Sequence, residues 1–147
     1  MKLFGGFLLL LASFLIPAGN LRALEKERRA AREIGEFLSR ASAEISFQAC
    51  PAPEMIAAFW NGRERRALSF QEVMKGVEGW GDSGLLLRDY VASLSRSTVE
   101  GGLRLTETFL GRIREEETRL SGRIEEVRRL RLPLYPALTL LILLVLL

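Results

Sequence analysis

The sequence of 147 residues contains no histidine and only one cysteine, Cys50. Histidine is the commonest general base and metal ligand near neutral pH, and an internal disulfide needs two cysteines. A lone thiol needs a base to become a nucleophilic thiolate, and no imidazole is present to do this. We therefore interpret Cys50 as a small apolar filler. The sequence predicts a protein that is not an enzyme, without catalytic residues, metal or cofactor; an enzyme using Cys50 or the carboxylates is the rival hypothesis.

Charge of one sign does not accumulate anywhere in the chain. The 21 basic and 18 acidic residues give a net charge of +3, and the signs are mixed, as in Glu25–Arg29. A nucleic-acid interface needs a basic face with aromatic or base-reading side chains. The glycines of Gly76–Gly84 lack the lysine and hydroxyl of a phosphate-binding loop. We therefore expect neither a nucleic-acid partner nor a small-molecule substrate.

The two ends of the chain are apolar and the middle is charged. Apart from Lys2, every charged side chain lies within Arg22–Arg131, whereas Leu3–Ile16 and Leu134–Leu147 are nearly unbroken apolar runs. This distribution predicts an N-terminal transmembrane segment over residues 1–21, a cytoplasmic helical domain over 22–131 and a C-terminal transmembrane segment over 132–147.

The N-terminal run has two interpretations. A basic residue followed by 14 apolar residues is also typical of a secretory signal, but no clear small–x–small pattern marks a cleavage site near Ala18 and Gly19. Apolar character continues to about Ala23, which favours a membrane span with Pro17 as a kink. The alternative is a secreted helical binding domain released by cleavage after Ala18 or Gly19.

The C-terminal run just reaches the length of a membrane span. Leu130–Leu147 has 18 residues and one charge, Arg131, whose long side chain can reach the interface. Pro133 and Pro136 fall in the first turn, where proline costs least. Basic residues beside a span favour the cytoplasmic side, and both apolar ends have them on the side of the middle segment. We therefore predict a cytoplasmic middle, oriented mainly by Arg128, Arg129 and Arg131.

The middle segment has helical rather than alternating periodicity, which predicts an all-α bundle. A first helix over about Leu21–Ala49 ends at Cys50–Pro53 because proline cannot continue the hydrogen-bond ladder. A short helix, Glu54–Trp60, is expected to stop at Asn61–Gly62 in a left-handed turn. The apolar stripe of the first helix comprises Ile34, Phe37, Leu38, Ala41 and Ile45.

Two further helices follow. Ser69 and Glu72 have the spacing of a capping box, which predicts that a third helix begins at Phe70. Four of the thirteen glycines lie in Gly76–Gly84, which indicates a turn or hinge. A fourth helix carries Leu86, Tyr90, Val91 and Leu94.

The longest periodic segment is Val99–Arg131, which as one helix would span on the order of 50 Å. We expect it to pack antiparallel to the first helix, so that both apolar ends emerge on one side. Consecutive residues of a helix point in different directions, so Glu115–Glu117 is not a catalytic cluster but a solvated face paired with nearby arginines. Its candidate partner-docking residues are Glu115, Glu116 and Arg119. The expected pairing joins Ile34, Phe37, Leu38 and Ile45 to Ile113, Leu120, Ile124 and Val127.

One motif of the first helix resembles a known family. Glu44, Ile45, Phe47 and Pro51 match the Glu-Ile-x-aromatic-x-x-x-Pro pattern of the stage III sporulation protein AB family, and Glu54 is also in place. The same order of membrane segment, helical domain and C-terminal membrane segment extends the resemblance over nearly the whole chain.

Other positions agree only in part with that family. Tyr90 and Leu94 stand where it has an aromatic-Gly-x-x-Leu-Gly segment, but Val91 and Ser95 replace the glycines. Thr98 and Gly102 replace its usual Asp and Gln, whereas Arg114–Glu116 resembles its charged long helix.

The resemblance implies a component of the secretion-like channel complex that joins mother cell and forespore. Its helical domain would be similar to the inner-membrane platform protein of type II secretion and type IV pilus machines. The expected partners are other stage III sporulation channel subunits, the membrane, and a cytosolic secretion-type ATPase. The expected location is the mother-cell or outer forespore membrane. This extension to mechanism is an analogy of fold.

Overall fold

The computed structural model describes residues 2–47, 52–64 and 69–146, and every regular element in them is helical. The elements are α1 (Lys2–Phe47), α2 (Ala52–Glu64), α3 (Phe70–Val77), η1 (Glu78–Trp80), α4 (Gly81–Leu94), α5 (Val99–Glu126), η2 (Val127–Arg131) and α6 (Leu132–Leu146). The prediction of an all-α fold is confirmed for these residues.

The chain divides into two packed units. Unit 1 comprises Met1–Lys26 and Arg119–Leu147, and unit 2 comprises Glu27–Thr118. Helices α1 and α5 each contribute residues to both units. The predicted boundaries at residues 21 and 131 followed the change in charge, whereas the packing changes at residues 26 and 118.

Helix α1 is one continuous element of 46 residues that contains Pro17. We predicted that the first helix of the middle segment begins at about Leu21, and this start is wrong, because the helix runs from Lys2. Proline removes one backbone hydrogen bond, but the other bonds of the ladder remain and the helix continues through it. A change from apolar to charged side chains does not itself end a helix. The predicted stop at Cys50 lies outside the described residues.

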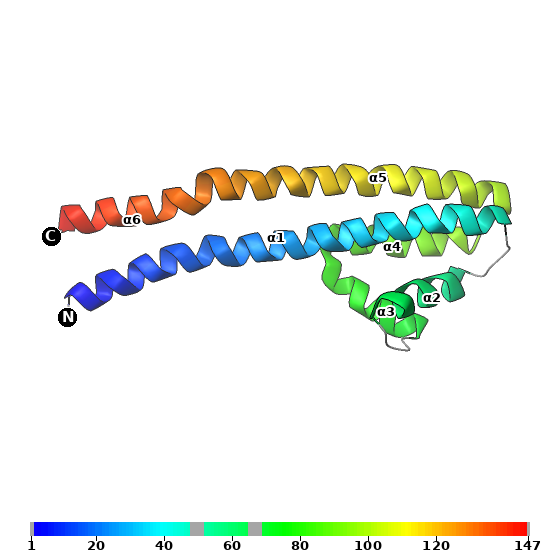
Figure 1. The fold of residues 1–147 in the computed structure, drawn as a ribbon, viewed down its shortest axis with the longest axis horizontal. Coiled ribbons are helices and arrows are strands. Elements are labelled where there is room, and N and C mark those ends of the chain that lie inside the picture. The colour runs from blue at the N-terminus through cyan, green and yellow to red at the C-terminus, as the bar shows by residue number, and fades with distance from the viewer. Residues whose placement is uncertain (1, 48–51, 65–68, 147) are drawn as a thin grey trace. The chain divides into compact units, whose positions relative to one another are not determined.

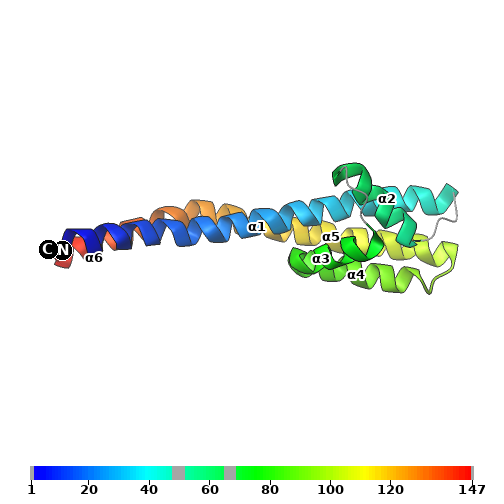
Figure 2. The same ribbon diagram turned by 90° about the horizontal axis from the view of Figure 1, so that it is seen from below.

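The core of unit 2 is rich in aromatic side chains. The Phe37 ring on α1 lies 5.4 Å from that of Phe59, 5.2 Å from that of Trp60 and 6.4 Å from that of Tyr90. Trp60 also stacks on Trp80 of η1 at 5.8 Å. Figure 1 and Figure 2 show α2, α3 and α4 beside the segments of α1 and α5 that belong to this unit. The remaining buried members are Ile34, Leu38, Ala41, Met55, Ile56, Val73, Val77, Leu87, Phe109 and Ile113.

Helix α2 is longer than the sequence predicted. It continues through Asn61 and Gly62 to Glu64, so the expected left-handed stop is wrong. Asn and Gly tolerate the left-handed conformation without requiring it, and a glycine inside a helix costs only about 1 kcal/mol relative to alanine. Within the described part of the chain, the one glycine with positive φ is Gly81.

The capping box that begins α3 is confirmed. The Ser69 hydroxyl accepts a hydrogen bond from the Glu72 backbone N–H, and the Glu72 carboxylate accepts one from the Ser69 N–H at 2.7 Å. The bond from the Ser69 backbone, aided by its side chain, lowers the pKa of Glu72. Two orphan N–H groups of the first turn are satisfied in this way.

The glycine-rich stretch forms a turn, as predicted, with η1 followed by Gly81 at φ 62°. Gly84 lies in the first turn of α4, where an added Cβ would stand 2.1 Å from the Val77 carbonyl oxygen. Only glycine fits at this distance. Two glycines therefore set the sharp change of direction between α3 and α4.

Helices α4 and α5 are joined in the core by a short chain of hydroxyl groups. Tyr90 Oη and Thr106 Oγ1 are 2.9 Å apart, and Thr106 donates to the Gly102 carbonyl at 2.7 Å. Burial raises the pKa of Tyr90, opposed by the bond with Thr106. The predicted fourth helix is confirmed, and the buried hydroxyl group of Tyr90 has a partner.

The predicted pairing of the first and last helices is correct in direction and only partly correct in register. In unit 2, Ile113 joins the core cluster of Ile34, Phe37 and Leu38, and Gly35 approaches Ile113. Ile45 lies opposite Gly102. Leu120, Ile124 and Val127 are buried in unit 1, whereas Ile34, Phe37, Leu38 and Ile45 belong to unit 2. In an antiparallel pair, residues further along one helix face residues further back on the other, and the prediction omitted this offset.

Candidate membrane and partner-binding surfaces

Unit 1 is an antiparallel pair formed by the start of α1 and the segment that comprises the end of α5, η2 and α6. Figure 1 and Figure 2 place the two ends of the chain at the same end of this unit. A Cβ added at Gly6 would lie 2.9 Å from Leu143 Cδ2, which shows how closely the two helices approach. The two apolar segments of the chain therefore lie side by side within unit 1.

On the N-terminal part of α1 the inner face of this pair is built from small or polar groups, whereas the outer face carries large apolar side chains. On α1 the buried positions include Gly6, Ser13 and Pro17. Ser13 satisfies its hydroxyl by donating to the Leu10 carbonyl at 2.8 Å. The exposed side chains include Phe4, Phe7, Leu8, Leu9, Phe14, Leu15 and Ile16 on α1, and Leu134, Leu138, Leu140, Leu141, Ile142, Leu144 and Val145 on α6.

The outer surface of this pair exposes the large apolar side chains that a protein in water normally buries. Large apolar side chains are normally buried, and a contiguous exposed patch of them marks a binding surface or a membrane-facing one. The most apolar 18-residue window of α1, within Phe4–Ile45, has a mean hydropathy of 1.8, and 11% of it is buried. By length and composition α1 is the one helix in the described ranges that could cross a membrane, although a signal sequence has the same features.

Helix α6 is apolar but short. Its 15 residues would span about 22 Å, less than the roughly 30 Å of a bilayer core. It continues from η2, a π-helical turn in which the Leu132 N–H bonds to the Val127 carbonyl. The predicted C-terminal segment thus begins inside a continuous helical run.

The π-turn changes which side chains face α1. The inward positions on the C-terminal helical segment of the pair are Ile124 and Val127, then Leu132, Pro136, Thr139 and Leu143. The successive inward-facing residues Val127 and Leu132 are five positions apart. In an unbroken α-helix the next inward position after Val127 would come four residues later, and Arg131 would lie on the inner face. A π-turn holds one extra residue. Arg131 is consequently exposed, and an apolar residue takes the inner position.

The predicted membrane-orienting residues, Arg128, Arg129 and Arg131, all lie in η2 and are exposed. Arg128 Nη2 binds Glu25 Oε1 of α1 at 2.6 Å. This ion pair links the two helical segments of unit 1. It lies close to the position along them at which the charged residues end and the apolar residues begin. No local pattern in the sequence indicates it, because its members are 103 positions apart.

The predicted docking residues Glu115, Glu116 and Arg119 lie on α5, but the unit boundary falls among them. Glu115 and Glu116 belong to unit 2, whereas Arg119 belongs to unit 1. Glu115 is exposed, as expected of a solvated face. Glu116 is half-buried and has an interaction partner, so it is less solvated than Glu115.

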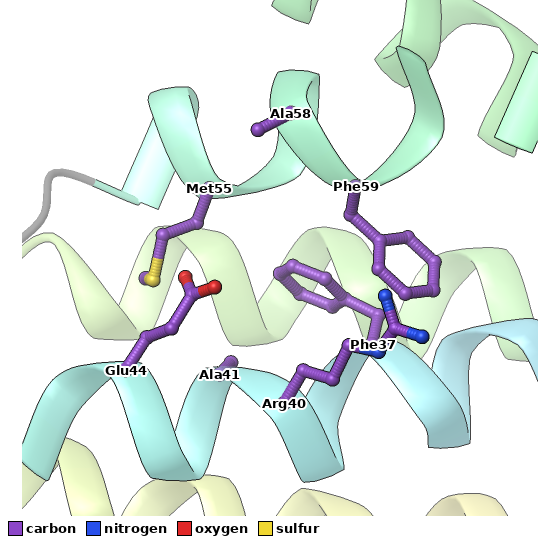
Figure 3. Close-up of a pocket in the computed structure, with 7 residues that line it drawn as sticks. All are labelled: Phe37, Arg40, Ala41, Glu44, Met55, Ala58 and Phe59. Atoms are coloured by element: carbon purple, nitrogen blue, oxygen red, sulfur yellow. The ribbon is translucent and has the colours of Figure 1, made fainter. Parts of the chain in front are cut away.

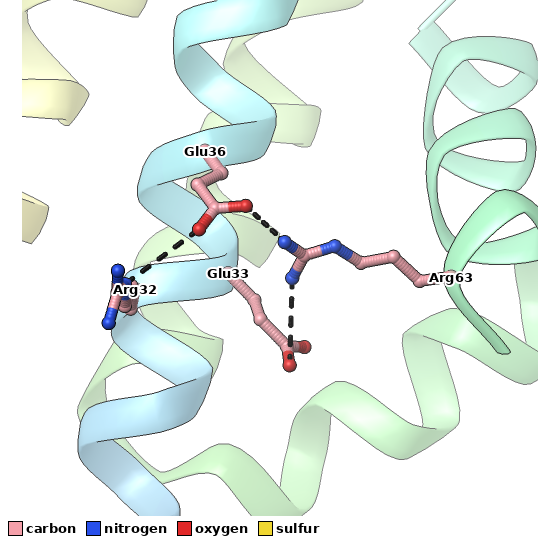
Figure 4. A network of polar contacts seen from close by, with 4 residues as sticks. All are labelled: Arg32, Glu33, Glu36 and Arg63. Atoms are coloured by element: carbon pink, nitrogen blue, oxygen red, sulfur yellow. Dashed lines mark hydrogen bonds and ion pairs between the residues drawn. The ribbon is translucent and has the colours of Figure 1, made fainter.

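A polar network that the sequence did not reveal joins α1 to α2 (Figure 4). Arg63 of α2 forms ion pairs with Glu36 and, at 3.6 Å, with Glu33, and Arg32 lies 3.8 Å from Glu36. The Arg63 guanidinium also lies 5.2 Å from the centre of the Phe59 ring. A signal was present in the i,i+4 spacing of Arg32 and Glu36, but nothing local marks Arg63 as their partner.

A shallow cavity of about 140 Å³ lies beside this network (Figure 3). Its floor is apolar and includes Phe37 and Phe59, while Arg40 and Glu44 stand at its rim. Arg40 lies over the Phe59 ring at 5.3 Å. No three acidic or thiol side chains of the described residues converge as metal ligands, and Cys50 lies outside those residues.

Neither a protein-family model, nor a curated protein, nor a solved structure matches this chain. Within residues 2–47, 52–64 and 69–146, fold and surface define a helical protein with one apolar helix long enough to cross a membrane.

Proposed function

We propose that this protein is a non-enzymatic membrane component whose two ends cross one bilayer as an antiparallel helical pair, and whose unit 2 docks other subunits from the cytoplasmic side. The observation that carries the proposal is the outer surface of unit 1, where large apolar side chains from both ends of the chain are exposed. In water each such side chain would forgo about 1.5–3 kcal/mol of burial, whereas lipid removes that cost.

The inner face of unit 1 supports a pair rather than two independent spans. Lipid provides no hydrophobic force between helices, so helices in a bilayer associate through close packing of small residues and polar contacts. Gly6 provides such an approach to Leu143. The short α6 would reach across the bilayer core with the help of η2, whose arginines can extend to the headgroups.

Two measurements test the membrane assignment. The full-length protein should resist extraction from membranes at alkaline pH, which removes peripheral proteins. Within Gly76–Gly84, a reporter that works only in the cytoplasm should be active, and a reporter that works only outside it should be inactive. At either end of the chain, the two kinds of reporter should give the opposite result. Complete alkaline extraction would overturn the membrane assignment, and an externally active Gly76–Gly84 fusion would reverse the topology.

The finer assignment, a stage III sporulation channel component in the mother-cell or outer forespore membrane, rests on the Glu44, Ile45, Phe47 and Pro51 motif and on the order of segments. The partners would be other channel subunits and a cytosolic secretion-type ATPase. Affinity purification of the detergent-solubilised full chain from sporulating cells should recover those subunits. Substituting Glu115 and Arg119 by alanine should reduce recovery if α5 carries the docking surface; recovery of none of these subunits by the unaltered chain would remove the assignment.

The secreted alternative has one specific observation in its favour, because an apolar helix at the N-terminus also serves as a signal sequence. Cleavage after Ala18 or Gly19 would, however, remove Gly6, Ser13 and Pro17 from the inner face that packs against α6. N-terminal sequencing of the mature protein separates the two functions, because the membrane function needs residues 2–18 to be retained.

A further inference from the structure

Four exposed basic side chains surround unit 1 where its apolar surface begins. They are Arg22 and Lys26 of α1 and Arg129 and Arg131 of η2, and none has a hydrogen-bond or ion-pair partner within the described ranges. We refer to these four residues as the collar.

The pair between Glu25 and Arg128 fixes the level of the collar on both helices. Its 2.6 Å bond brings residue 25 of α1 beside residue 128 of η2. Toward the apolar end, Arg22 lies three residues from Glu25, and Arg131 lies three residues from Arg128. Three residues of helix correspond to about 4.5 Å along the axis. The backbone positions of both arginines are therefore roughly one turn nearer the apolar surface than the ion pair. Lys26 and Arg129 adjoin the pair itself.

The charge around the collar is one-sided. The pair of Glu25 and Arg128 neutralises itself, and no charged residue lies between Arg131 and residue 146, or between Lys2 and Arg22. Glu125 and Glu126 are exposed one turn away from the apolar end. The collar therefore presents four cations directly beside an apolar surface, with its neighbouring carboxylates on the opposite side.

We propose that the collar binds the headgroups of anionic phospholipids, a proposal that rests on the membrane function above. A guanidinium donates two parallel hydrogen bonds to phosphate oxygens, and an ammonium adds a point charge. An acyl chain attached to such a phosphate would lie against the exposed leucines of α1 and α6. A soluble acidic peptide would satisfy the charges but not this adjoining apolar surface, which favours lipid.

The π-turn is part of this site. If η2 were an α-helix, Arg131 would fall on the inner face of unit 1 instead of its surface. The extra residue thus serves two purposes: it keeps an apolar position against α1, and it turns the last arginine outward to headgroup level.

Flotation of the full-length protein with lipid vesicles tests the proposal. One set of vesicles contains phosphatidylcholine alone, and the other contains phosphatidylcholine with phosphatidylglycerol. The quadruple variant R22A/K26A/R129A/R131A is compared with R88A/R96A/R104A/R114A, which removes the same number of exposed cations from unit 2. A basic residue at an anionic surface contributes roughly fivefold in partition, so four additive contributions would amount to several hundredfold. The collar variant should therefore lose at least about tenfold of the preference for anionic vesicles.

The result expected is a preference of the unaltered chain for anionic vesicles that is lost in the collar variant, kept in the unit 2 variant and weakened in about 1 M salt. Equal losses in both variants would assign the preference to net charge and overturn the collar. Absence of any preference would also overturn it. Binding of a soluble acidic peptide by the collar, in place of lipid, would reassign the site to a protein partner.

Flotation with phosphatidylcholine alone reports membrane insertion independently of the collar. Failure there, in all variants, contradicts the membrane function. Success there without an anionic preference contradicts only the collar.

Discussion

The two units of this chain use apolar side chains in opposite ways. In unit 2, aromatic and aliphatic residues from α1, α2, α4 and α5 close around Phe37, which is 2% exposed. In the N-terminal part of α1, which belongs to unit 1, small or polar groups line the inner face and large apolar side chains point outward, so that Phe7 is 63% exposed. The same helix α1 contributes to both, because its inward stripe changes from Gly6, Ser13 and Pro17 to Ile34 and Phe37. Unit 2 buries its apolar side chains away from water, and under the proposed membrane function the exposed apolar side chains of unit 1 would face lipid.

The sharpest test of this comparison is the same substitution in each unit. Phe37→Ala should cost about 3–5 kcal/mol of the unfolding free energy of unit 2, because it opens a cavity among Phe59, Trp60 and Tyr90. Phe7→Ala should leave the thermal unfolding of unit 2 unchanged and instead reduce retention in membranes. Differential scanning calorimetry in detergent and alkaline extraction measure the two effects.

An exposed carboxylate provides the control for Phe37→Ala. Glu115→Ala, on the outer face of α5, should shift the melting temperature little. A larger loss of stability with Glu115→Ala than with Phe37→Ala would show that the assignment of core and surface is wrong.

The second test removes the extra residue of the π-turn. Deleting Leu130, which is exposed, should convert the five-residue step between Val127 and Leu132 into an α-helical step of four and keep the inner face in register. Deleting Leu138 instead removes the same residue type but rotates everything beyond it by about 100°.

Cross-linking measures this difference. With Gly6→Cys and Leu143→Cys in a Cys50→Ala background, oxidation should join the two helices efficiently in the parent and in the Leu130 deletion, and poorly in the Leu138 deletion. Equal cross-linking in both deletions would mean that the pair adjusts freely and that the π-turn does not set the register.

A smaller effect is expected at the start of α3. Ser69→Ala removes the hydroxyl that caps the helix and should cost about 1 kcal/mol, whereas Ser69→Asn retains a capping acceptor and should cost less. Urea unfolding of the full chain in detergent measures both; equal losses would contradict the capping role.

The capping box also predicts the sign of one pH effect. The pKa of Glu72 is lowered in the folded protein, so its contribution to stability is present above its unfolded value of 4.5. That contribution is lost as the pH falls through the lower, folded value. Glu72→Gln should therefore lower the free energy of unfolding slightly at neutral pH. It should also reduce the further loss of stability between about pH 5 and pH 3, measured by urea unfolding at each pH.

The smallest expected effect concerns the Arg63 network. Arg63→Ala removes ion pairs with Glu33 and Glu36 that are partly exposed, and such pairs contribute about 0–1 kcal/mol. Arg63→Lys keeps the charge but loses the planar stacking on Phe59, so it separates the two contributions. Added salt should weaken the contribution of the ion pairs and leave that of the stacking on Phe59 unchanged. If Arg63→Ala reduced the free energy of unfolding by several kcal/mol, the network would instead organise the packing of α2.

The sequence by itself determined the helical class, the capping box at Ser69, the glycine turn and the two apolar ends. Each depends on groups within a few residues, or on a periodicity that one helix carries along its whole length. Tertiary structure alone decided where units 1 and 2 divide, that α1 continues through Pro17, and that α2 continues through Gly62. It also decided the antiparallel register, the pairing of Arg63 and Glu25 with distant partners, and the π-turn that directs Arg131 outward. These features depend on which side chains meet across helices, and a periodic stripe specifies the face of a helix without specifying how far it slides along its neighbour.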